Sequence, residues 1–211
     1  MAPSTLPLLY LASESPRRQE LLQQIGIPYT VLRLPPVEGE DEPRQANEAP
    51  VVYVQRTAFE KAQRAQQWFA QGNPEREQSN DGHIHLPILA ADTTVALGDT
   101  ILGKPVDVQH AVSILSQLSG QTHTVYTAVV LAHQTRIYTG LSTSLVSFKH
   151  LSQTEIAQYI DTNDCFGKAG AYGIQGFAAR FIRDLQGSYS GVMGLPLYET
   201  AELLRTAKIL C

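Results

Sequence analysis

Apolar and polar positions along the first half of the chain alternate with two different periods. The apolar run Leu8–Ala12 predicts a short strand, and Ser15-Pro16, followed by apolar residues at helical spacing, predicts a helix. Pro28–Leu34 predicts a second strand, and Val51–Ala70 carries its apolar positions on one face of a long helix. Pro87–Thr94 then predicts a buried strand.

The second half of the chain begins with a helical pattern and continues with a long antiparallel hairpin. Val108–Leu118 is amphipathic, while Thr122–Ala132 and Arg136–Phe148 alternate and are rich in Val, Thr and Tyr. Two further helices and a strand are predicted at Ser152–Ile160, Pro196–Ala207 and Phe181–Leu185. These elements predict an α/β fold with a mixed twisted β-sheet and flanking helices, built as one domain over residues 1–211.

The charge balance excludes several classes of partner. The 211 residues include 16 Lys and Arg against 20 Asp and Glu, a formal net charge of −4, which argues against a nucleic-acid polymer bound through its phosphates. The longest charge-free apolar run, Val125–Ala132, is far shorter than the roughly 20 residues that cross a bilayer, so no membrane association is expected. Cys165 and Cys211 form no metal-binding pattern, and a reducing cytoplasm is the expected location.

A polar turn joins the first predicted strand to the first helix. Ala12–Arg18 places two hydroxyls and the guanidinium groups of Arg17 and Arg18 where free backbone N–H groups and the helix dipole favour an anion. This pattern predicts a phosphate site. A capped helix with solvated arginines has the same pattern, so both interpretations stay open.

A carboxylate lies near the end of the predicted strand Pro87–Thr94. Asp92 is the first catalytic candidate, because α/β enzymes place reacting groups at the carboxyl ends of their strands. An Asp that caps the following turn is the structural alternative.

Two segments carry incomplete enzyme motifs. Gly98–Pro105 fits the P-loop spacing G-x-x-x-x-G-K, but Pro105 stands where a P-loop needs a hydroxyl and a backbone N–H. Lys104 can still contact a phosphate as a point charge. Gly187–Gly191 has Tyr189 where a serine hydrolase has its nucleophile, so it predicts no hydrolase site.

A third segment, Lys168–Gly176, spaces three glycines three residues apart, which lets a backbone approach a ligand closely. Gln175 within it offers an amide that can both donate and accept hydrogen bonds. A tight structural turn would use the same residues.

Taken together, these segments resemble the Maf family of nucleoside triphosphate pyrophosphatases over nearly the whole chain. The resemblance rests on six motifs in order, Ala12–Arg18, Ala91–Thr93, Gly103–Pro105, Leu118–His123, Lys168–Gly176 and Gly187–Pro196. It implies two lobes around a central cleft, a structure related to the inosine-triphosphatase group. It also implies hydrolysis of a nucleoside triphosphate to the monophosphate and pyrophosphate with a divalent cation, Mg²⁺ or Mn²⁺.

Within the family, Lys168–Gly176 is similar to the subgroup that acts on dTTP and UTP, as distinct from the subgroup that acts on a methylated guanine nucleotide. Two other functions stay open at this point. One is a purine-directed house-cleaning pyrophosphatase of the same fold, and the other is a nucleotide-binding regulator of cell division without turnover. A homodimer is a further expectation, because the long hairpin offers strand edges that a second copy could cover.

The resemblance implies roles for individual residues. Asp92 would be the proton acceptor, and Arg17, Thr93 and Gln175 fall at the specificity positions of the dTTP and UTP subgroup. Further contacts to substrate would come from Ser13, Arg18, Lys61, Lys104 and Lys168. Because magnesium prefers oxygen ligands, Glu38 is predicted to hold the cation together with Asp92.

Two segments depart from the family's pattern. The loop after Glu38 is unusually acidic and rich in proline, so Glu40 and Asp41 are alternatives for the same carboxylate. The family's usual Gly-Glu-Pro before the glycine segment is replaced by Asn163-Asp164-Cys165. The shape of that second loop is therefore not fixed by the resemblance.

Overall fold

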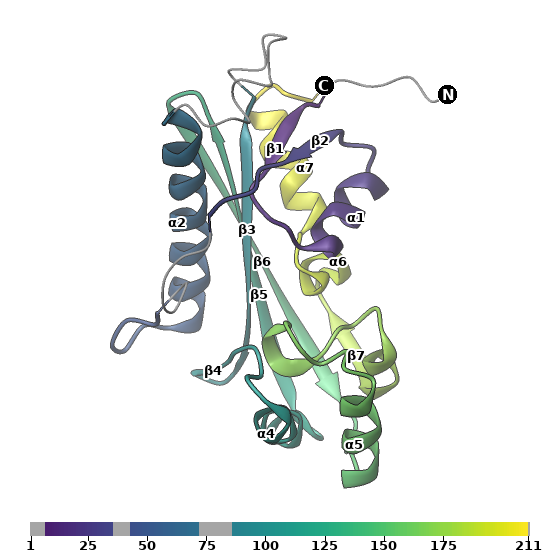
Figure 1. Ribbon diagram of the computed structural model, residues 1–211. Coiled ribbons are helices and arrows are strands. Elements are labelled where there is room, and N and C mark those ends of the chain that lie inside the picture. The colour runs from purple at the N-terminus through teal and green to yellow at the C-terminus, as the bar shows by residue number, and fades with distance from the viewer. Residues whose placement is uncertain (1–6, 36–42, 72–85, 211) are drawn as a thin grey trace.

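A computed structural model describes residues 7–35, 43–71 and 86–210, which form a mixed β-sheet with helices packed on it (Figure 1). Within these residues the sheet has seven strands in the order β2-β1-β3-β5-β6-β7, with β4 paired to β3. The strands are β1 (Leu9–Leu11), β2 (Tyr29–Val31), β3 (Ile88–Leu97), β4 (Thr100–Leu102), β5 (Thr122–His133), β6 (Arg136–Phe148) and β7 (Ile182–Gln186). β1 runs parallel to β2 and β3, and the other pairs are antiparallel. The predicted mixed α/β fold is confirmed.

The predicted helices form close to their expected bounds. They are α1 (Pro16–Gln24), α2 (Pro50–Ala70), α4 (Val108–Leu118), α5 (Gln153–Asp161) and α7 (Leu197–Thr206). Two short 3₁₀ segments, η1 (Ala169–Ala171) and η2 (Phe177–Phe181), and the five-residue helix α6 (Tyr189–Met193) were not predicted. None of the helices in the described residues has the length and apolar character needed to span a bilayer.

The strand that contains Asp92 is longer than the sequence predicts. The expected end at Thr94 is wrong, because Thr93 and Thr94 continue to pair with β5 and the strand runs on to Leu97. Gly98, with a φ of 58°, then forms a two-residue turn with Asp99 that leads back into β4. The two threonines look like a strand end in the sequence, but as β-branched residues they fit a strand interior equally well.

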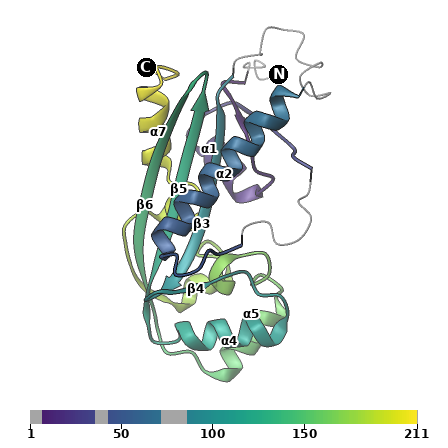
Figure 2. The same cartoon turned by 90° about the vertical axis from the view of Figure 1, so that its left-hand side faces the viewer.

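Successive residues of β3 pack on opposite faces of the sheet. Leu89 and Ala91 belong to a core with α1 and α7, whereas Ile88 and Ala90 belong to a core with α2. Figure 2 shows α2 lying along the strands. Because side chains alternate along a strand, Asp92 continues the series that faces α2.

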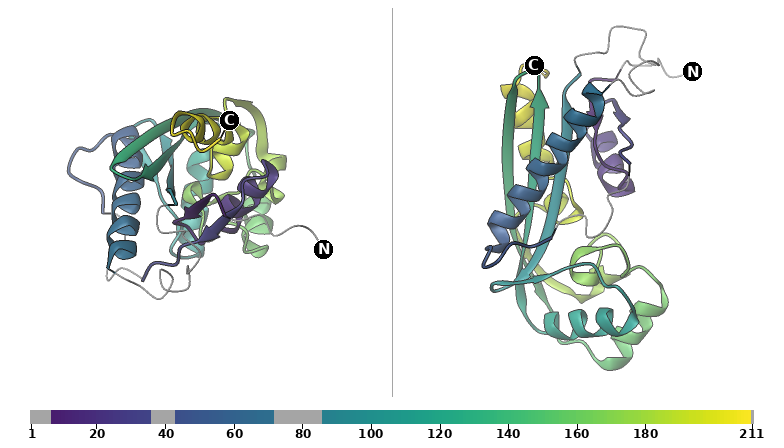
Figure 3. Two further views of the ribbon diagram at one scale, coloured as in Figure 1. Left: turned by 90° about the horizontal axis from the view of Figure 1, so that it is seen from above. Right: turned by 60° about the vertical axis from the view of Figure 1, so that its left-hand side comes forward.

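A further core lies beyond these two layers, around α4, α5 and the glycine segment. It includes Val95 from β3 and Val125 from β5, together with the aromatic residues Phe148, Tyr159 and Phe181. Figure 1 shows this part at the lower end of the sheet, and the right-hand view of Figure 3 shows it apart from the layers above. The long strands β3, β5 and β6 run from one part into the other, so the molecule has two lobes.

Helix α2 is built to approach the sheet closely. Its buried face consists largely of small side chains, including Ala58, Ala62 and Ala65. Pro50 occupies its first turn, where a missing N–H leaves no hydrogen bond unmade. This close packing brings polar side chains of the same helix into contact with β3.

Candidate active site

One edge of β3 is open between two short partner strands. β1 pairs with β3 only at Ile88 and Leu89, and β4 pairs with it only from Val95 to Leu97, both on the edge opposite β5. Among the described strands, none pairs with Ala90–Thr94 on that edge. Asp92 therefore lies beside a gap in the sheet, in the middle of the strand, and the expected position at a strand's carboxyl end is wrong.

A pocket of about 480 Å³ lies at this gap. Its walls come from the turn before α1, from α2, from the middle of β3, from the loop after β4, from the glycine segment and from the end of α6. Nine of the ten site residues expected from the sequence line it: Ser13, Arg17, Arg18, Lys61, Asp92, Thr93, Lys104, Lys168 and Gln175. Glu38, like Glu40 and Asp41, lies outside the described residues.

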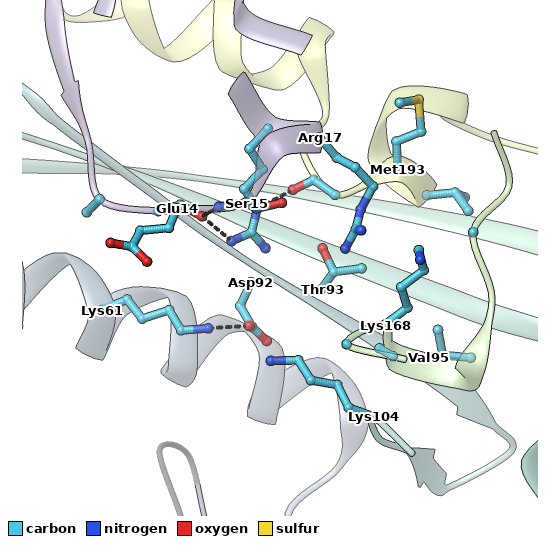
Figure 4. Close-up of a pocket in the computed structure, with 18 of the residues that line it drawn as sticks. Glu14, Ser15, Arg17, Lys61, Asp92, Thr93, Val95, Lys104, Lys168 and Met193 are labelled. Carbon is cyan, nitrogen blue, oxygen red and sulfur yellow. Dashed lines mark hydrogen bonds and ion pairs between the residues drawn. The ribbon is translucent and has the colours of Figure 1, made fainter. Parts of the chain in front are cut away.

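Asp92 is held by helix α2. Its side chain is largely buried, and Lys61 Nζ donates to Oδ1 at 2.6 Å while Thr57 Oγ1 donates to Oδ2 at 2.9 Å. Figure 4 shows the ends of Lys61 and Lys104 directed toward this carboxylate. The ammonium group of Lys61 thus compensates the buried negative charge.

The turn before α1 forms a polar corner of the pocket. The Ser15 side chain caps nothing in α1, although Pro16 begins the helix as predicted. Arg18 is instead fixed by two bonds, from Nε to the Gly194 carbonyl at 2.8 Å and from a terminal nitrogen to Ser13 Oγ at 3.2 Å. Arg17 extends into the pocket in Figure 4. Both guanidinium groups therefore lie where a phosphate group could be bound.

Thr93 extends from the face of the sheet opposite to that of Asp92, and contacts there with Thr127 orient its hydroxyl. Its hydroxyl lies 3.1 Å from the hydroxyl of Thr127, which also donates to the Gly191 carbonyl at 2.7 Å. The Thr127 hydroxyl is the donor in both contacts, so its single proton is shared between the Gly191 carbonyl and the hydroxyl oxygen of Thr93. The Thr93 hydroxyl therefore accepts from Thr127 and does not use its own proton in this contact.

The glycine segment is anchored at its start by backbone contacts. Gly170 has a φ of 69°, and its N–H donates to the Gly103 carbonyl at 3.1 Å. A Cβ at Gly170 would lie 2.9 Å from a methyl group of Val95, so the segment lies directly on β3.

An ion pair fixes the rest of the glycine segment. Asp164 Oδ1 accepts from Lys168 Nζ at 2.9 Å, and Oδ2 accepts from Tyr159 at 3.1 Å. The stem of Lys168 lies against Gly173, and the Asp164 carboxylate lies against Gly176. The departure from the family's pattern thus leaves a carboxylate that holds the loop. Lys168 reaches the pocket wall while its ammonium group is engaged by Asp164.

Comparison with known proteins shows which family the chain belongs to. Residues 8–207 match the model of a family described as Maf-like protein. The chain belongs to the Maf-like family. It is 55% identical over 203 residues to a protein named dTTP/UTP pyrophosphatase from Bordetella avium, with 96% of each chain covered. Proteins of the same name from Cupriavidus pinatubonensis and Xanthomonas axonopodis pv. citri are 47% and 48% identical, over 95% and 93% of this chain and 97% of each of theirs.

The pocket of this Maf-like protein is electropositive although the chain is acidic. Six cationic side chains line it in the described residues, against the two carboxylates Glu14 and Asp92. Arg64, one of the six, was not predicted from the sequence, although it follows Lys61 by three residues on the same helix. Thr57 was also missed, because a Thr between apolar helix positions resembles a core residue.

A buried histidine contacts the glycine segment through Tyr172. His123 lies within 2.8 Å of the hydroxyl of Tyr172, and both side chains are at most 5% exposed. Burial lowers the pKa of His123 to about 4, so the ring is neutral at pH 7. Tyr172 lines the pocket. The sequence motif Leu118–His123 therefore contributes to the site through a buried contact.

The donors around Asp92 are compatible with a divalent cation. No group of three or more His, Cys, Asp or Glu side chains able to hold a metal occurs in the described residues. Magnesium keeps several waters and needs only one or two carboxylates besides the substrate phosphates. Each carboxylate oxygen of Asp92 has two lone pairs and uses one in its bond to α2. Asp92 thus retains acceptor capacity for a cation or a water.

Proposed function

We propose that this Maf-like protein is a nucleoside triphosphate pyrophosphatase that hydrolyses dTTP and UTP to the monophosphate and pyrophosphate. The observation that carries the proposal is the pocket on the open edge of β3, in which six cationic side chains and the carboxylate of Asp92 line one cavity. The relatives of 47–55% identity that are named dTTP/UTP pyrophosphatase support this substrate class.

The cationic side chains would bind the triphosphate. Arg17, Arg18, Lys61 and Lys104 line the pocket, and each charge-assisted contact to a phosphate contributes about 1.5–3 kcal/mol. The net charge of −4 does not oppose this binding strongly, because charges farther away than roughly 8 Å are largely screened at physiological salt. Ser13 and Lys168 would add contacts at the two ends of the pocket.

Asp92 would orient the attacking water and accept its proton. Phosphoryl and nucleotidyl transfer depend mainly on positioning and charge neutralisation, so a fixed carboxylate beside cationic groups suits the reaction. Asp92, with Glu38 as the proposed second ligand, would hold Mg²⁺ or Mn²⁺. When bound, that cation supplies charge neutralisation on the phosphate oxygens and acidifies water.

The glycine segment would select the base. Thymine and uracil present an acceptor, a donor and an acceptor along one edge, and the amide of Gln175 carries both complementary groups. Arg17 and Thr93, which line the same pocket, would complete the specificity contacts. A base that leaves the amide unpaired loses about 1–3 kcal/mol, or tenfold to a hundredfold in selectivity.

Three broader features are part of the same proposal. Residues 1–211 would act as one domain, and the protein would work in the cytoplasm on free nucleotides. A homodimer would form where a second copy pairs with β6, whose residues 136–144 have β5 as their one strand neighbour within the described residues.

A panel of triphosphates tests the proposal. Pyrophosphate release from dTTP, UTP, CTP, GTP and ATP is measured with purified protein, with Mg²⁺ and with a chelator. We expect Mg²⁺-dependent release, with kcat/KM for dTTP and UTP at least about tenfold above the other three. A preference for GTP or ATP would favour the purine-directed enzyme, and tight nucleotide binding without release would favour the regulator.

A further inference from the structure

Both oxygens of the Asp92 carboxylate are held by the same helix. Lys61 Nζ donates to Oδ1 at 2.6 Å and Thr57 Oγ1 donates to Oδ2 at 2.9 Å. Thr57 and Lys61 are four residues apart on α2, so their side chains extend from the same face one turn apart. Rotation of the carboxylate would break at least one of these bonds, and the pair therefore fixes its plane.

The Thr57 hydroxyl has one proton and two acceptors within reach. The Val54 carbonyl lies at 3.1 Å, the common contact of a helical Thr with its own backbone, and Asp92 Oδ2 lies at 2.9 Å. Hydrogen bonds to an ionised acceptor are shorter and stronger than bonds to a neutral one. The proton is therefore directed mainly to Asp92.

Thr57 acts on the pocket only through Asp92. Its side chain is completely buried, and it is absent from the set of residues that line the cavity. Water cannot replace its hydroxyl without a change in the packing of α2 on β3. Loss of the hydroxyl would leave Oδ2 of a largely buried carboxylate without this donor.

We propose that Thr57 is a positioning residue for the pyrophosphatase reaction. Its hydroxyl sets the plane of the Asp92 carboxylate, so that the lone pairs not used by α2 are presented to the pocket. This inference rests on the proposed function, in which Asp92 accepts a proton from water. It differs from the role of Lys61, which also supplies charge next to the substrate.

Three substitutions at this position, compared with the wild type, separate the effect of the hydroxyl from the effect of side-chain size. Thr57 and Thr57→Ser carry a hydroxyl, whereas Thr57→Val and Thr57→Ala do not. Val has nearly the same size and shape as Thr, and Ser and Ala are both smaller, so size and hydroxyl vary independently. We expect Thr57→Val to lower kcat for dTTP roughly tenfold to a hundredfold with KM within about twofold, because Thr57 does not touch substrate. Thr57→Ser should retain most of kcat, and Thr57→Ala should resemble Thr57→Val.

A double-mutant cycle tests the contact without any measurement of activity. The fall in melting temperature caused by Thr57→Val is measured in the wild type and in an Asp92→Ala background. We expect the fall to be at least halved when Asp92 is absent, because no buried carboxylate then loses its donor. Equal falls in the two backgrounds would show that the hydroxyl and the carboxylate are not coupled.

The possible outcomes distinguish this inference from the proposed function. If the wild type hydrolyses dTTP and kcat follows side-chain size instead of the hydroxyl, the inference is overturned and the function stands. A rise in KM with unchanged kcat in Thr57→Val would also overturn it, since that result indicates a binding role. If the wild type releases no pyrophosphate from any nucleotide, the proposed function fails, and the role of Thr57 in the reaction fails with it. The double-mutant cycle then still shows whether the Thr57 hydroxyl and the Asp92 carboxylate are coupled.

Discussion

The two ends of the pocket are held in place by different means. At the Asp92 end, the functional side chains extend from the regular elements β3 and α2, and their positions follow from strand register and helical period. At the other end, the glycine segment from Lys168 to Gly176 has little regular structure and is fixed by the ion pair to Asp164 and by close backbone packing. The first end is held by the backbone hydrogen bonds between β3 and β5 and by helix α2, whereas the second end depends on a few specific contacts.

This difference suits the chemistry proposed for each end. Phosphate groups are the same in every nucleotide, so the end that binds them and activates water needs one fixed geometry. Bases differ, and a loop held by side-chain contacts can be changed by substitution without any disturbance of the sheet. Changes at the Asp92 end should therefore alter turnover of all substrates, and changes in the glycine segment should alter stability or preference.

The largest effect is expected from Asp92→Asn. The substitution keeps the shape of the side chain and removes the proton acceptor, so turnover should fall by roughly 10²–10⁴. Circular dichroism and thermal melting should show a folded protein, because β3 stays paired with β5 on its other edge. Full activity, or a protein that does not fold, would contradict the catalytic role.

A pair of glycine substitutions tests how tightly the second end is packed. Gly167 and Gly170 share a φ of 69°, but a Cβ at Gly167 meets nothing within 4 Å, whereas a Cβ at Gly170 lies 2.9 Å from Val95. Gly167→Ala should cost about 1–2 kcal/mol from the backbone strain alone. Gly170→Ala should cost about 2–4 kcal/mol, because overpacking against β3 is added. The free energies of unfolding in urea measure both, and equal losses would mean that the segment moves away from β3 at little cost.

The sequence predicted the elements of both ends but not the contacts between them. Arg17, Asp92 and Gln175 could be assigned to one site because whole motifs resemble a known family, although they lie up to 158 residues apart in the chain. Thr57 could not, because its contact with Asp92 depends on how α2 is placed along β3. Local patterns carry no information on that placement. The same limit applies to the contact of Gly170 with Val95, and to the open edge at Ala90–Thr94, which depends on where β1 and β4 stop pairing.

The buried His123 makes the second end sensitive to acid. Its pKa is about 4 in the folded protein and about 6.5 when exposed, so between these values the unfolded chain binds a proton that the folded chain does not. The stability present above pH 6.5 is therefore lost as the pH falls toward 4, by about 2 kcal/mol between pH 7 and pH 5.

Urea unfolding of the wild type and His123→Gln at pH 7 and pH 5 measures this loss. Hydrogen bonds from Arg56 and Lys149 lower the pKa values of Glu48 and Glu155 to about 2, so these groups reduce stability only as the pH falls below about 4.5. The interval from pH 7 to pH 5 thus keeps the titration of these two carboxylates out of the measurement. His123→Gln should show a pH dependence smaller by about 2 kcal/mol, and an unchanged dependence would assign the loss to other groups.

The smallest expected effect is on the choice of nucleotide base and comes from a substitution of Gln175. Gln175→Ala should lower kcat/KM for dTTP and UTP by about tenfold while CTP and GTP change by less than about twofold, because the amide is proposed to read only the edge that thymine and uracil share. The control is Gln186→Ala on β7, which removes a glutamine that does not line the pocket. Equal losses for all four nucleotides would indicate that Gln175 supports the loop or the phosphates. Preference lost without a general loss of rate would instead indicate that the two ends of the pocket act separately, with turnover set on β3 and α2 and base choice set by a segment that only packs against them.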